Sequence, residues 1–476
     1  MRINMEKKNT WETYSSKQLK ELEKINAQYR DFLDNGKTER ECIDTIVNTI
    51  EKSGYRELES LIKEGAALKT GDKVYSVWMN KSIAMFQIGR KPMTEGMNIL
   101  GAHIDSPRLD VKQNPLYEDG GFAYLDTHYY GGVKKYQWVT IPLAIHGVIV
   151  KKDGTCVEIN IGENEDDPVF FVSDLLIHLA QEQLEKKAAK VIEGEALDII
   201  VGNKPLLIDK KDKKKDEKEA GKEAVKAGVL DILKETYDIR EEDFVSAELE
   251  IVPAGKAREA GFDRSMTLAY GQDDRVCAYT SMQAMLDSDV TDRTMCCILV
   301  DKEEIGSVGA TGMQSHFFEN AVAEVMNLTG EYSELHVRRC LAHSCMLSSD
   351  VSSAFDPTYA SSFDKKNVAY LGGGMVINKF TGARGKSGSN DANAEYLAHL
   401  RHIFDKAEVN FQTAELGKVD LGGGGTIAYI LALYGMNVID SGVAVLNMHA
   451  PWEATSKADV YETYRGYKAF VEGASL

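Results

Sequence analysis

Short apolar runs alternate with helical stretches over most of the chain, and this alternation constrains the fold more than any other feature. Three such runs are Ile99-Leu100, Met295 to Val300 and Val438 to Val445, each bounded by glycine or acidic residues. Short apolar runs with such boundaries are typical of strands, and strands that alternate with helices predict an α/β sheet. Apolar spacing and a capping-box pattern predict helices near the N-terminus over residues 17–35 and 38–54.

Between residues 109 and 260 the pattern changes to an apolar/polar alternation with a period of two, which is typical of antiparallel strands. Apolar residues share one face from Val139 to Ile145, and a Lys152-Asp153-Gly154 turn leads into a second alternating stretch. The sequence therefore predicts an α/β domain formed by residues 1–108 and 261–476, interrupted by an inserted β-rich domain.

The net charge argues against nucleic acid and membrane surfaces as partners. Lys plus Arg is 56 and Asp plus Glu is 74, so the formal net charge is −18. A surface this acidic repels phosphate backbones and anionic lipid. The lysine-rich stretch from Asp209 to Glu223 mixes both signs without aromatic residues. That mixture is typical of a solvated loop or exposed helix rather than a nucleic-acid patch.

Cysteine usage and the absence of long apolar stretches predict a cytoplasmic protein. The seven cysteines include no C-x-x-C pair, and the adjacent Cys296 and Cys297 lie in an apolar run, where cysteine behaves as a small hydrophobe. No stretch approaches 18 apolar residues, and the polar start from Met1 to Ser16 lacks the apolar region of a signal peptide.

Five short segments carry metal-ligand residue types at predicted strand ends. They are Gly101-Ala102-His103-Ile104-Asp105-Ser106-Pro107, Gln272-Asp273-Asp274-Arg275, Leu299-Val300-Asp301-Lys302-Glu303-Glu304-Ile305-Gly306, Ser348-Ser349-Asp350-Val351-Ser352 and Leu446-Asn447-Met448-His449-Ala450-Pro451. Each segment alone has a plain structural explanation: a core histidine, a helix cap or a solvated turn. Together they place two histidines and three carboxylates at separate strand ends, as a two-metal hydrolase requires.

The spacing within and between these segments indicates roles for paired residues and predicts an inserted domain. In His103-x-Asp105 the carboxylate can bind the second ring nitrogen of a histidine ligand and fix its tautomer. If Glu303 and Glu304 continue an extended strand, their side chains point in opposite directions, so one can bind metal while the other faces the attacking water. His103 and Asp273 are 170 residues apart, whereas successive strand ends in a βαβ unit lie about 30 or more residues apart. An extra domain must therefore lie between them.

In order and spacing over nearly the whole chain, these segments resemble the metal motifs of the aspartyl aminopeptidase family of dinuclear zinc exopeptidases. The resemblance implies a phosphorylase/hydrolase-like mixed α/β sheet flanked by helices, with an inserted β-rich dimerisation domain. It also implies a homo-oligomer, a tetrahedral dodecamer built from dimers. Two divalent metal ions per subunit are expected, with zinc as the first candidate and cobalt or manganese as others.

The resemblance also implies a role for each residue of the metal segments. The expected ligands are His103, Asp273 and Asp350 for one ion, and Asp273, Glu304 and His449 for the other. Glu303 would be the general base, and Asp105 the residue behind His103. The family usually has an Asp-Asn pair where this chain has Asp273-Asp274, so Asp274 remains an alternative to Asp273 as the bridging carboxylate.

Two more residues enter through the resemblance as substrate-binding candidates. His178, within Leu175 to Leu179, matches a histidine that reaches from the inserted domain into a neighbouring subunit's active site. Without the resemblance, a lone histidine in an apolar helix would be a core residue. Lys379, within Asn378 to Lys386, is the positional candidate for binding an acidic N-terminal residue, and a solvated loop is the alternative. This stretch departs from the acid-selective pattern, so a preference for neutral or basic residues stays open.

The predicted function is a metal-dependent aminopeptidase that removes the N-terminal residue of peptides by means of a two-metal-activated water and the base Glu303. One alternative is a dinuclear amidohydrolase, such as a deacylase or carboxypeptidase. A second alternative is a non-catalytic, shell-forming binding protein whose metal site is vestigial. The intact set of five ligands and a base argues against the second alternative.

Overall fold

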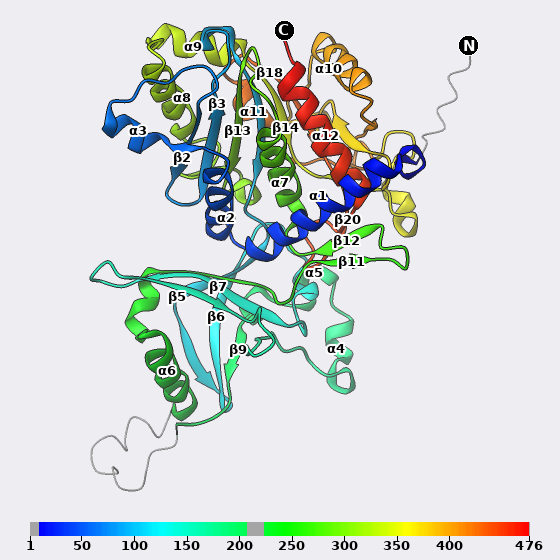
Figure 1. Cartoon of the computed structure of the whole chain (residues 1–476). Coiled ribbons are helices and arrows are strands. Elements are labelled where there is room, and N and C mark those ends of the chain that lie inside the picture. The colour runs from blue at the N-terminus through cyan, green and yellow to red at the C-terminus, as the bar shows by residue number, and fades with distance from the viewer. Residues whose placement is uncertain (1–8, 207–222, 476) are drawn as a thin grey trace. The chain divides into compact units, whose positions relative to one another are not determined.

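The computed structural model describes residues 9–206 and 223–475 (Figure 1). Its contacts divide the chain into two compact units. The α/β unit comprises Met1–Ser106, Ala257–Met448 and Trp452–Leu476, and the inserted unit comprises Pro107–Lys256 and His449–Pro451. Most of the lysine-rich stretch expected to be solvated lies outside the described residues.

The α/β unit is built on a mixed sheet that has nine strands among the described residues, in the order β1-β2-β3-β13-β4-β14-β18-β16-β17. The strands are β1 (Arg56–Glu57), β2 (Lys73–Trp78), β3 (Ser82–Gln87), β4 (Met97–His103), β13 (Thr294–Val300), β14 (Cys345–Ser349), β16 (Met375–Asn378), β17 (Phe411–Thr413) and β18 (Asn437–Gly442). The four central strands β13, β4, β14 and β18 are parallel neighbours. Strand β13 is apolar and buried along its whole length, as expected of a parallel strand covered on both faces.

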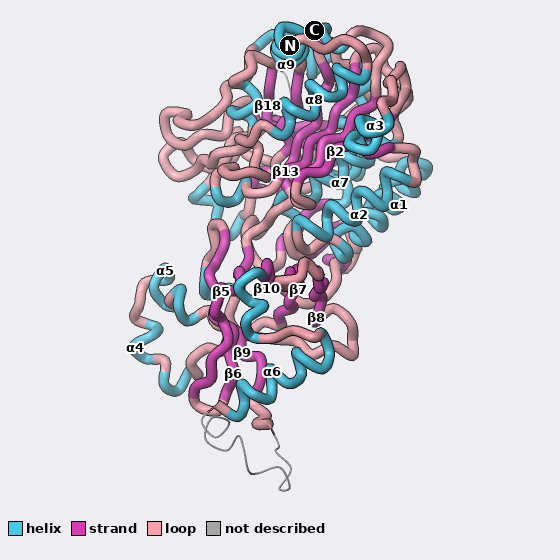
Figure 2. The backbone as a smooth tube through the Cα atoms, turned by 90° about the vertical axis from the view of Figure 1, so that its left-hand side faces the viewer, coloured by secondary structure: helices cyan, strands magenta, loops and turns pink. Residues whose placement is uncertain are grey.

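Helices cover both faces of this sheet (Figures 1 and 2). One apolar cluster includes residues of α1 (Ser16–Asn35), α2 (Glu39–Glu51), α7 (Gln272–Leu286), α10 (Ala394–Lys406) and α12 (Lys457–Gly473). A second includes residues of α3 (Leu58–Glu64), α8 (Phe317–Leu328), α9 (Glu334–His343) and α11 (Ala428–Ala432). Helices α1 and α2 each begin with a complete capping box, so the two predicted N-terminal helices are confirmed.

Smaller elements complete the α/β unit. A second sheet runs in the order β11 (Arg258–Ala260), β12 (Met266–Ala269), β20 (Glu453–Ser456), β19 (Ala444–Leu446) and β15 (Ser352–Ser353). The 3₁₀ turns are η1 (Thr10–Thr13), η2 (Met93–Glu95), η7 (Glu303–Ile305) and η8 (Pro357–Ser362).

The inserted unit is a separate antiparallel sheet with α6 (Ala224–Tyr237) and short helical turns. Its strand order is β8 (Cys156–Ile161), β7 (Leu143–Val150), β10 (Ala247–Pro253), β5 (Arg108–Asp119), β6 (Phe122–Tyr130) and β9 (Ile199–Gly202). The short turns are η3 (Lys135–Gln137), η4 (Ile177–Leu179), α4 (Gln181–Leu184), α5 (Ala188–Val191), η5 (Gly194–Ala196) and η6 (Glu241–Ser246).

The predicted Lys152-Asp153-Gly154 turn joins β7 to β8, but the alternation expected from Val139 onward was wrong at its start. Strand β7 begins only at Leu143. Thr140 has a φ of 62°, outside the extended region, and Pro142 has no N–H to donate to a neighbouring strand. The mixed α/β fold as a whole is confirmed, and no helix among the described residues is long and apolar enough to cross a membrane.

Candidate metal centre

Three adjacent parallel strands bring four of the predicted residues to one edge of the central sheet. His103 is the last residue of β4, Asp350 directly follows β14, and Glu303 and Glu304 follow β13 in the turn η7. Because β13, β4 and β14 run parallel side by side, their carboxyl ends meet at the same edge. This edge is where open α/β sheets bind ligands.

Asp273 and Asp274 reach the same edge from the first residues of α7. Both have non-helical backbone angles, the peptide bond between them is cis, and Gly271 before them is left-handed with a φ of 67°. Helix α7 packs against β4, so its first turn lies beside His103. An Asp-Asp pair at a helix start is often an ordinary cap, but here the N-cap position is Gly271 and both aspartates follow it.

The imidazole of His103 is fully enclosed by carboxyl groups. Its Nε2 lies 3.2 Å from Oδ1 of Asp273 and 3.9 Å from Oε2 of Glu303. Its Nδ1 lies 3.3 Å from Oδ1 of Asp105 and 3.0 Å from the Asp105 carbonyl oxygen. Asp105 therefore lies behind the ring, on the side away from Asp273, as the H-x-D spacing suggested.

Asp105 also fixes the turn that carries the two glutamates. Its carboxylate accepts the backbone N–H groups of Glu303 at 3.1 Å and Glu304 at 3.2 Å. The chain turns at Lys302, whose φ is 69°, and Glu303–Ile305 form a 3₁₀ turn. The extended strand end expected at this point was wrong, because two N–H donors have to face one buried carboxylate.

The described residues include groups whose ligand atoms lie close enough to share a metal ion. Within the α/β unit, His103 groups with Asp274 and Asp350, and separately with Glu303 and Glu304, all ligand atoms of a group lying within 4.8 Å of one another. Imidazole nitrogens and carboxylate oxygens are ligands that zinc accepts. Both carboxylate oxygens of Asp274 are buried without an ordinary hydrogen-bond partner, and a bound cation would satisfy them.

The electrostatics of the cluster also favour a bound cation. Burial raises the pKa of Asp274 and of Asp350 well above the usual range, and the neighbouring carboxylates raise both further. Burial alone would lower the pKa of His103, but hydrogen bonds with Asp105 and Asp273, together with the charge of Glu303, raise it well above its usual value. Crowded buried carboxylates repel one another until positive charge is added, so the donor set fits divalent metal.

Buried polar residues that the sequence did not single out hold Asp273 in place. Its N–H donates to Glu453 Oε2 at 3.0 Å, and its carbonyl oxygen accepts the hydroxyl of Ser106 at 2.6 Å. The neighbouring Gln272 accepts hydrogen bonds from Tyr29 at 3.0 Å and Thr455 at 2.7 Å. The tyrosine is 243 residues away in sequence, and no local pattern signals such a contact.

The remaining predicted residues do not belong to these strand ends or to the start of α7. His449 lies in the β19–β20 loop, where its Nδ1 is 3.1 Å from the carbonyl oxygen of Gly132. Lys379 follows β16, and its half-exposed ammonium group is 3.7 Å from Asp391 Oδ1. His178 lies in η4, and all of Leu175–Leu179 is exposed, so the core position considered for this histidine is wrong.

A mixed α/β sheet with an imidazole and several carboxylates at its carboxyl edge has the structural features of a metal-dependent hydrolase. A family model described as aminopeptidase I zinc metalloprotease (M18) matches residues 32–471. The chain belongs to this M18 aminopeptidase family, whose members are zinc metalloproteases, and the predicted enzyme class is confirmed.

Individual relatives match over nearly the full chain. The probable M18 family aminopeptidase 1 of Clostridium acetobutylicum is 63% identical over 466 residues, covering 98% of each chain. The crystal structure of aminopeptidase I from that organism has a TM-score of 0.88 at 60% identity and covers 98% of this chain and 99% of its own. The crystal structure of the Thermotoga maritima M18 aminopeptidase has a TM-score of 0.91 at 44% identity, with 99% and 100% covered.

Proposed function

We propose that the chain is a dinuclear metalloaminopeptidase in which Glu303 is the general base. The observation that carries the proposal is the convergence of one imidazole and several buried carboxylates at the carboxyl edge of the sheet, in a member of a zinc aminopeptidase family. The crowded carboxylates would require more positive charge than His103 alone supplies.

The proposed ligand sets are those that the family resemblance assigns by position in the sequence. One is His103, Asp273 and Asp350, and the other is Asp273, Glu304 and His449. Asp273 is proposed as the bridge because it lies 3.2 Å from His103 and matches the position that the family resemblance assigns to the bridging carboxylate. Asp274 is the alternative bridge, and among the described residues its ligand atoms group with those of His103 and Asp350.

In this mechanism the protein residues bind, orient and transfer protons. When bound, the two divalent ions would polarise the scissile carbonyl and lower the pKa of the attacking water. The Glu303 carboxylate takes a proton from that water and gives it to the leaving amine. Asp105 accepts the N–H of Glu303 and so fixes the turn from which the base projects.

Hydrolysis of two substrate classes tests this function. The enzyme, supplied with zinc, cobalt or manganese, should hydrolyse aminoacyl-anilides and leave N-acyl amino acids intact. Hydrolysis of the N-acyl compounds instead would indicate a deacylase or carboxypeptidase. Metal binding without hydrolysis of either class would indicate a binding protein with a vestigial site.

The preferred N-terminal residue is proposed to depend on Lys379. A buried substrate carboxylate needs a cation or strong hydrogen-bond donors. Lys379 follows the last residue of β16, and its ammonium group lies 3.7 Å from Asp391 Oδ1. Lys379→Ala should reduce kcat/KM selectively for Asp and Glu substrates, by about 2 kcal/mol or more if the ion pair is desolvated. Equal losses on Asp, Glu, Leu and Lys substrates would show that Lys379 does not distinguish charge.

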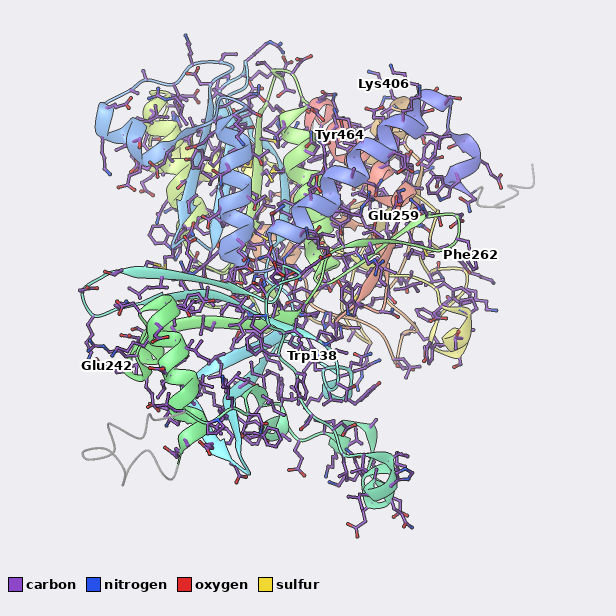
Figure 3. All side chains as sticks on the ribbon, turned by 60° about the horizontal axis from the view of Figure 1, so that its bottom comes forward. Trp138, Glu242, Glu259, Phe262, Lys406 and Tyr464 are labelled. Carbon is purple, nitrogen blue, oxygen red and sulfur yellow. The ribbon has the colours of Figure 1, made fainter. Side chains whose placement is uncertain are left out.

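We also propose a homo-oligomer, with a dodecamer built from dimers as the specific form. Apolar side chains that a monomer would bury are exposed at Phe262, between β11 and β12 (Figure 3), and at Leu176 and Leu179. The yeast mApe1 structure is a dodecamer at 20% identity and a TM-score of 0.74. In such an assembly His178 would act in a neighbouring subunit's active site. A cytoplasmic location is proposed because all seven cysteines are free thiols.

A further inference from the structure

Asp440 is a buried carboxylate that belongs to none of the ligand sets above. It lies near the carboxyl end of β18 with 1% of its surface exposed. On one side it pairs in register with Ser348 of β14, two residues before Asp350. On the other side it pairs with Asn378 of β16, the residue before Lys379. Asp440 thus stands between the metal-binding end of β14 and the substrate-binding candidate after β16.

The carboxylate of Asp440 is tied to a glycine-rich loop through one hydroxyl group. Its Oδ1 accepts the hydroxyl of Thr426 at 2.6 Å. Thr426 directly follows the run Gly422–Gly425 and precedes α11. Among the described residues, Oδ2 of Asp440 has no hydrogen bond of ordinary geometry, and the side chain of Ser348 lies beside the carboxyl group. A buried carboxylate without hydrogen bonds is costly, so the hydroxyl of Thr426 stabilises Asp440 and thereby helps to fix the loop.

The glycine run in turn packs directly on the segment that contains Lys379. The N–H of Gly424 donates to the carbonyl oxygen of Thr381 at 3.1 Å. A Cβ atom at Gly423, whose φ is 120°, would lie 2.3 Å from the Cα of Ala383. The two backbones therefore meet without side chains between them, and a shift of the glycine run would move the 379–386 segment.

We propose that Asp440 and Thr426 are positioning residues for substrate binding, which hold the glycine run against the 379–386 segment and thereby set the shape of the site beside the metal centre. Neither side chain touches metal or substrate in this role. The inference rests on the proposed aminopeptidase function, and it assigns a use to two polar residues that the metal chemistry does not employ.

The test compares Thr426→Val with Thr426→Ser on a leucyl-anilide in the zinc-loaded enzyme. Valine keeps the shape of threonine but removes the hydroxyl, whereas serine keeps the hydroxyl. KM should rise about tenfold in Thr426→Val, as expected for the loss of a hydrogen bond to a charged group. Its kcat should stay within about threefold, and its zinc content should match wild type. Thr426→Ser should have nearly wild-type KM.

A double-mutant cycle and a measurement on the loop complete the test. Adding Asp440→Ala to Thr426→Val should raise KM no further than Asp440→Ala alone, because both changes remove the same bond. The amide of Gly424 should exchange hydrogen faster in Thr426→Val than in Thr426→Ser.

The results that would contradict the proposal can be told apart. A wild-type enzyme that hydrolyses no aminoacyl substrate would overturn the proposed function and this inference with it. An active wild type with unchanged KM in Thr426→Val would overturn the positioning role alone. A loss of zinc or of kcat in place of the KM effect would also overturn it, by placing the role of Thr426 at the metal centre.

Discussion

Two regions depart in opposite ways from the usual pattern, in which apolar side chains are buried and charged ones are exposed. They are the carboxyl edge of the central sheet and the 175–184 segment of the inserted unit. At the sheet edge, Asp105 and Asp274 are completely buried. In the 175–184 segment, the apolar side chains of Ile177 and Leu179 are 66% and 68% exposed. Buried charge and exposed apolar surface are both unfavourable for an isolated domain. Such departures are expected at functional sites, and we propose a cation site at the sheet edge and a surface for another protein chain at the 175–184 segment.

The two regions also differ in how they are held. Asp105 is fixed by two backbone N–H donors, and the Asp273 loop is fixed by Glu453 and Ser106. The 175–184 segment has one short helical turn, η4, followed by α4, a single turn of four residues. The carboxylates at the sheet edge are therefore held by contacts within the chain, whereas the exposed segment presents apolar side chains that we propose a partner chain covers.

The largest effect is expected from Asp273→Ala. A carboxylate that bridges two ions balances charge at both, so its loss should release at least one ion and reduce kcat/KM by about 10⁴ or more. Metal analysis of the purified variant and steady-state kinetics measure the two effects. Asp274→Ala is the matched comparison, and it should lose at most one ion and retain more activity than Asp273→Ala. If Asp274→Ala loses metal and Asp273→Ala keeps it, the bridge has been assigned to the wrong aspartate.

Glu303→Gln should leave metal binding intact while it slows the reaction. The amide cannot accept the proton of the attacking water, so kcat should fall by about 10² to 10⁴. Both ions should remain, because Glu303 is not a proposed ligand. Glu59→Gln, a change at an exposed glutamate on α3, should have no effect on either quantity. Near wild-type turnover in Glu303→Gln would remove Glu303 from the role of base.

A mixing experiment tests whether the exposed segment completes a neighbouring active site. His178→Phe and Glu303→Gln should each be inactive or nearly so. After subunit exchange, some sites would combine an intact base with an intact His178 from another chain, and part of the activity should return. Exchange demonstrated by mass spectrometry without any recovery would contradict a role for His178 in a neighbouring subunit.

A smaller effect, on the pH dependence of stability, is expected from a buried carboxyl group that lies outside the proposed ligand sets. Asp459 accepts the N–H groups of Gly372 and Gly374 at 2.9 and 2.8 Å, and burial raises its pKa to about 8. A raised folded-state pKa means that the folded protein holds a proton that the unfolded chain has released. This carboxyl therefore reduces stability as pH rises from about 4 to 8.

Asp459→Asn should remove that pH dependence. Relative to wild type, its free energy of unfolding should gain roughly 2 kcal/mol between pH 6 and pH 8. Any constant loss from the altered hydrogen bonds to the glycines cancels in this comparison of slopes. Urea unfolding at the two pH values measures it, and parallel pH curves for the two proteins would contradict the raised pKa.

The sequence carried enough information to predict the parts of the site that depend on strand ends. His103, Glu303, Glu304 and Asp350 each follow an apolar run, and parallel strands bring such positions together whatever lies between them in the chain. The capping boxes of α1 and α2 were equally predictable, because each is a contact between residues three apart.

What the sequence could not predict depends on contacts between distant residues. The hydrogen bonds from Asp273 to Glu453 and from Tyr29 to Gln272 join residues 180 and 243 positions apart. The 3₁₀ turn at Glu303 follows from the hydrogen bond to the buried acceptor Asp105. No local sequence pattern around Glu303 indicates this contact. The late start of β7 was partly predictable, because Pro142 lacks the N–H that a strand donates, whereas the positive φ of Thr140 has no local signal.

Zinc titration of the metal-free enzyme measures directly whether activity depends on two bound ions per subunit. After removal of metal with a chelator, activity on an aminoacyl-anilide should require two equivalents of zinc per subunit. The Glu303→Gln variant should bind the same two equivalents without recovering activity. Full activity at one equivalent, or in the metal-free enzyme, would contradict the dinuclear centre proposed here.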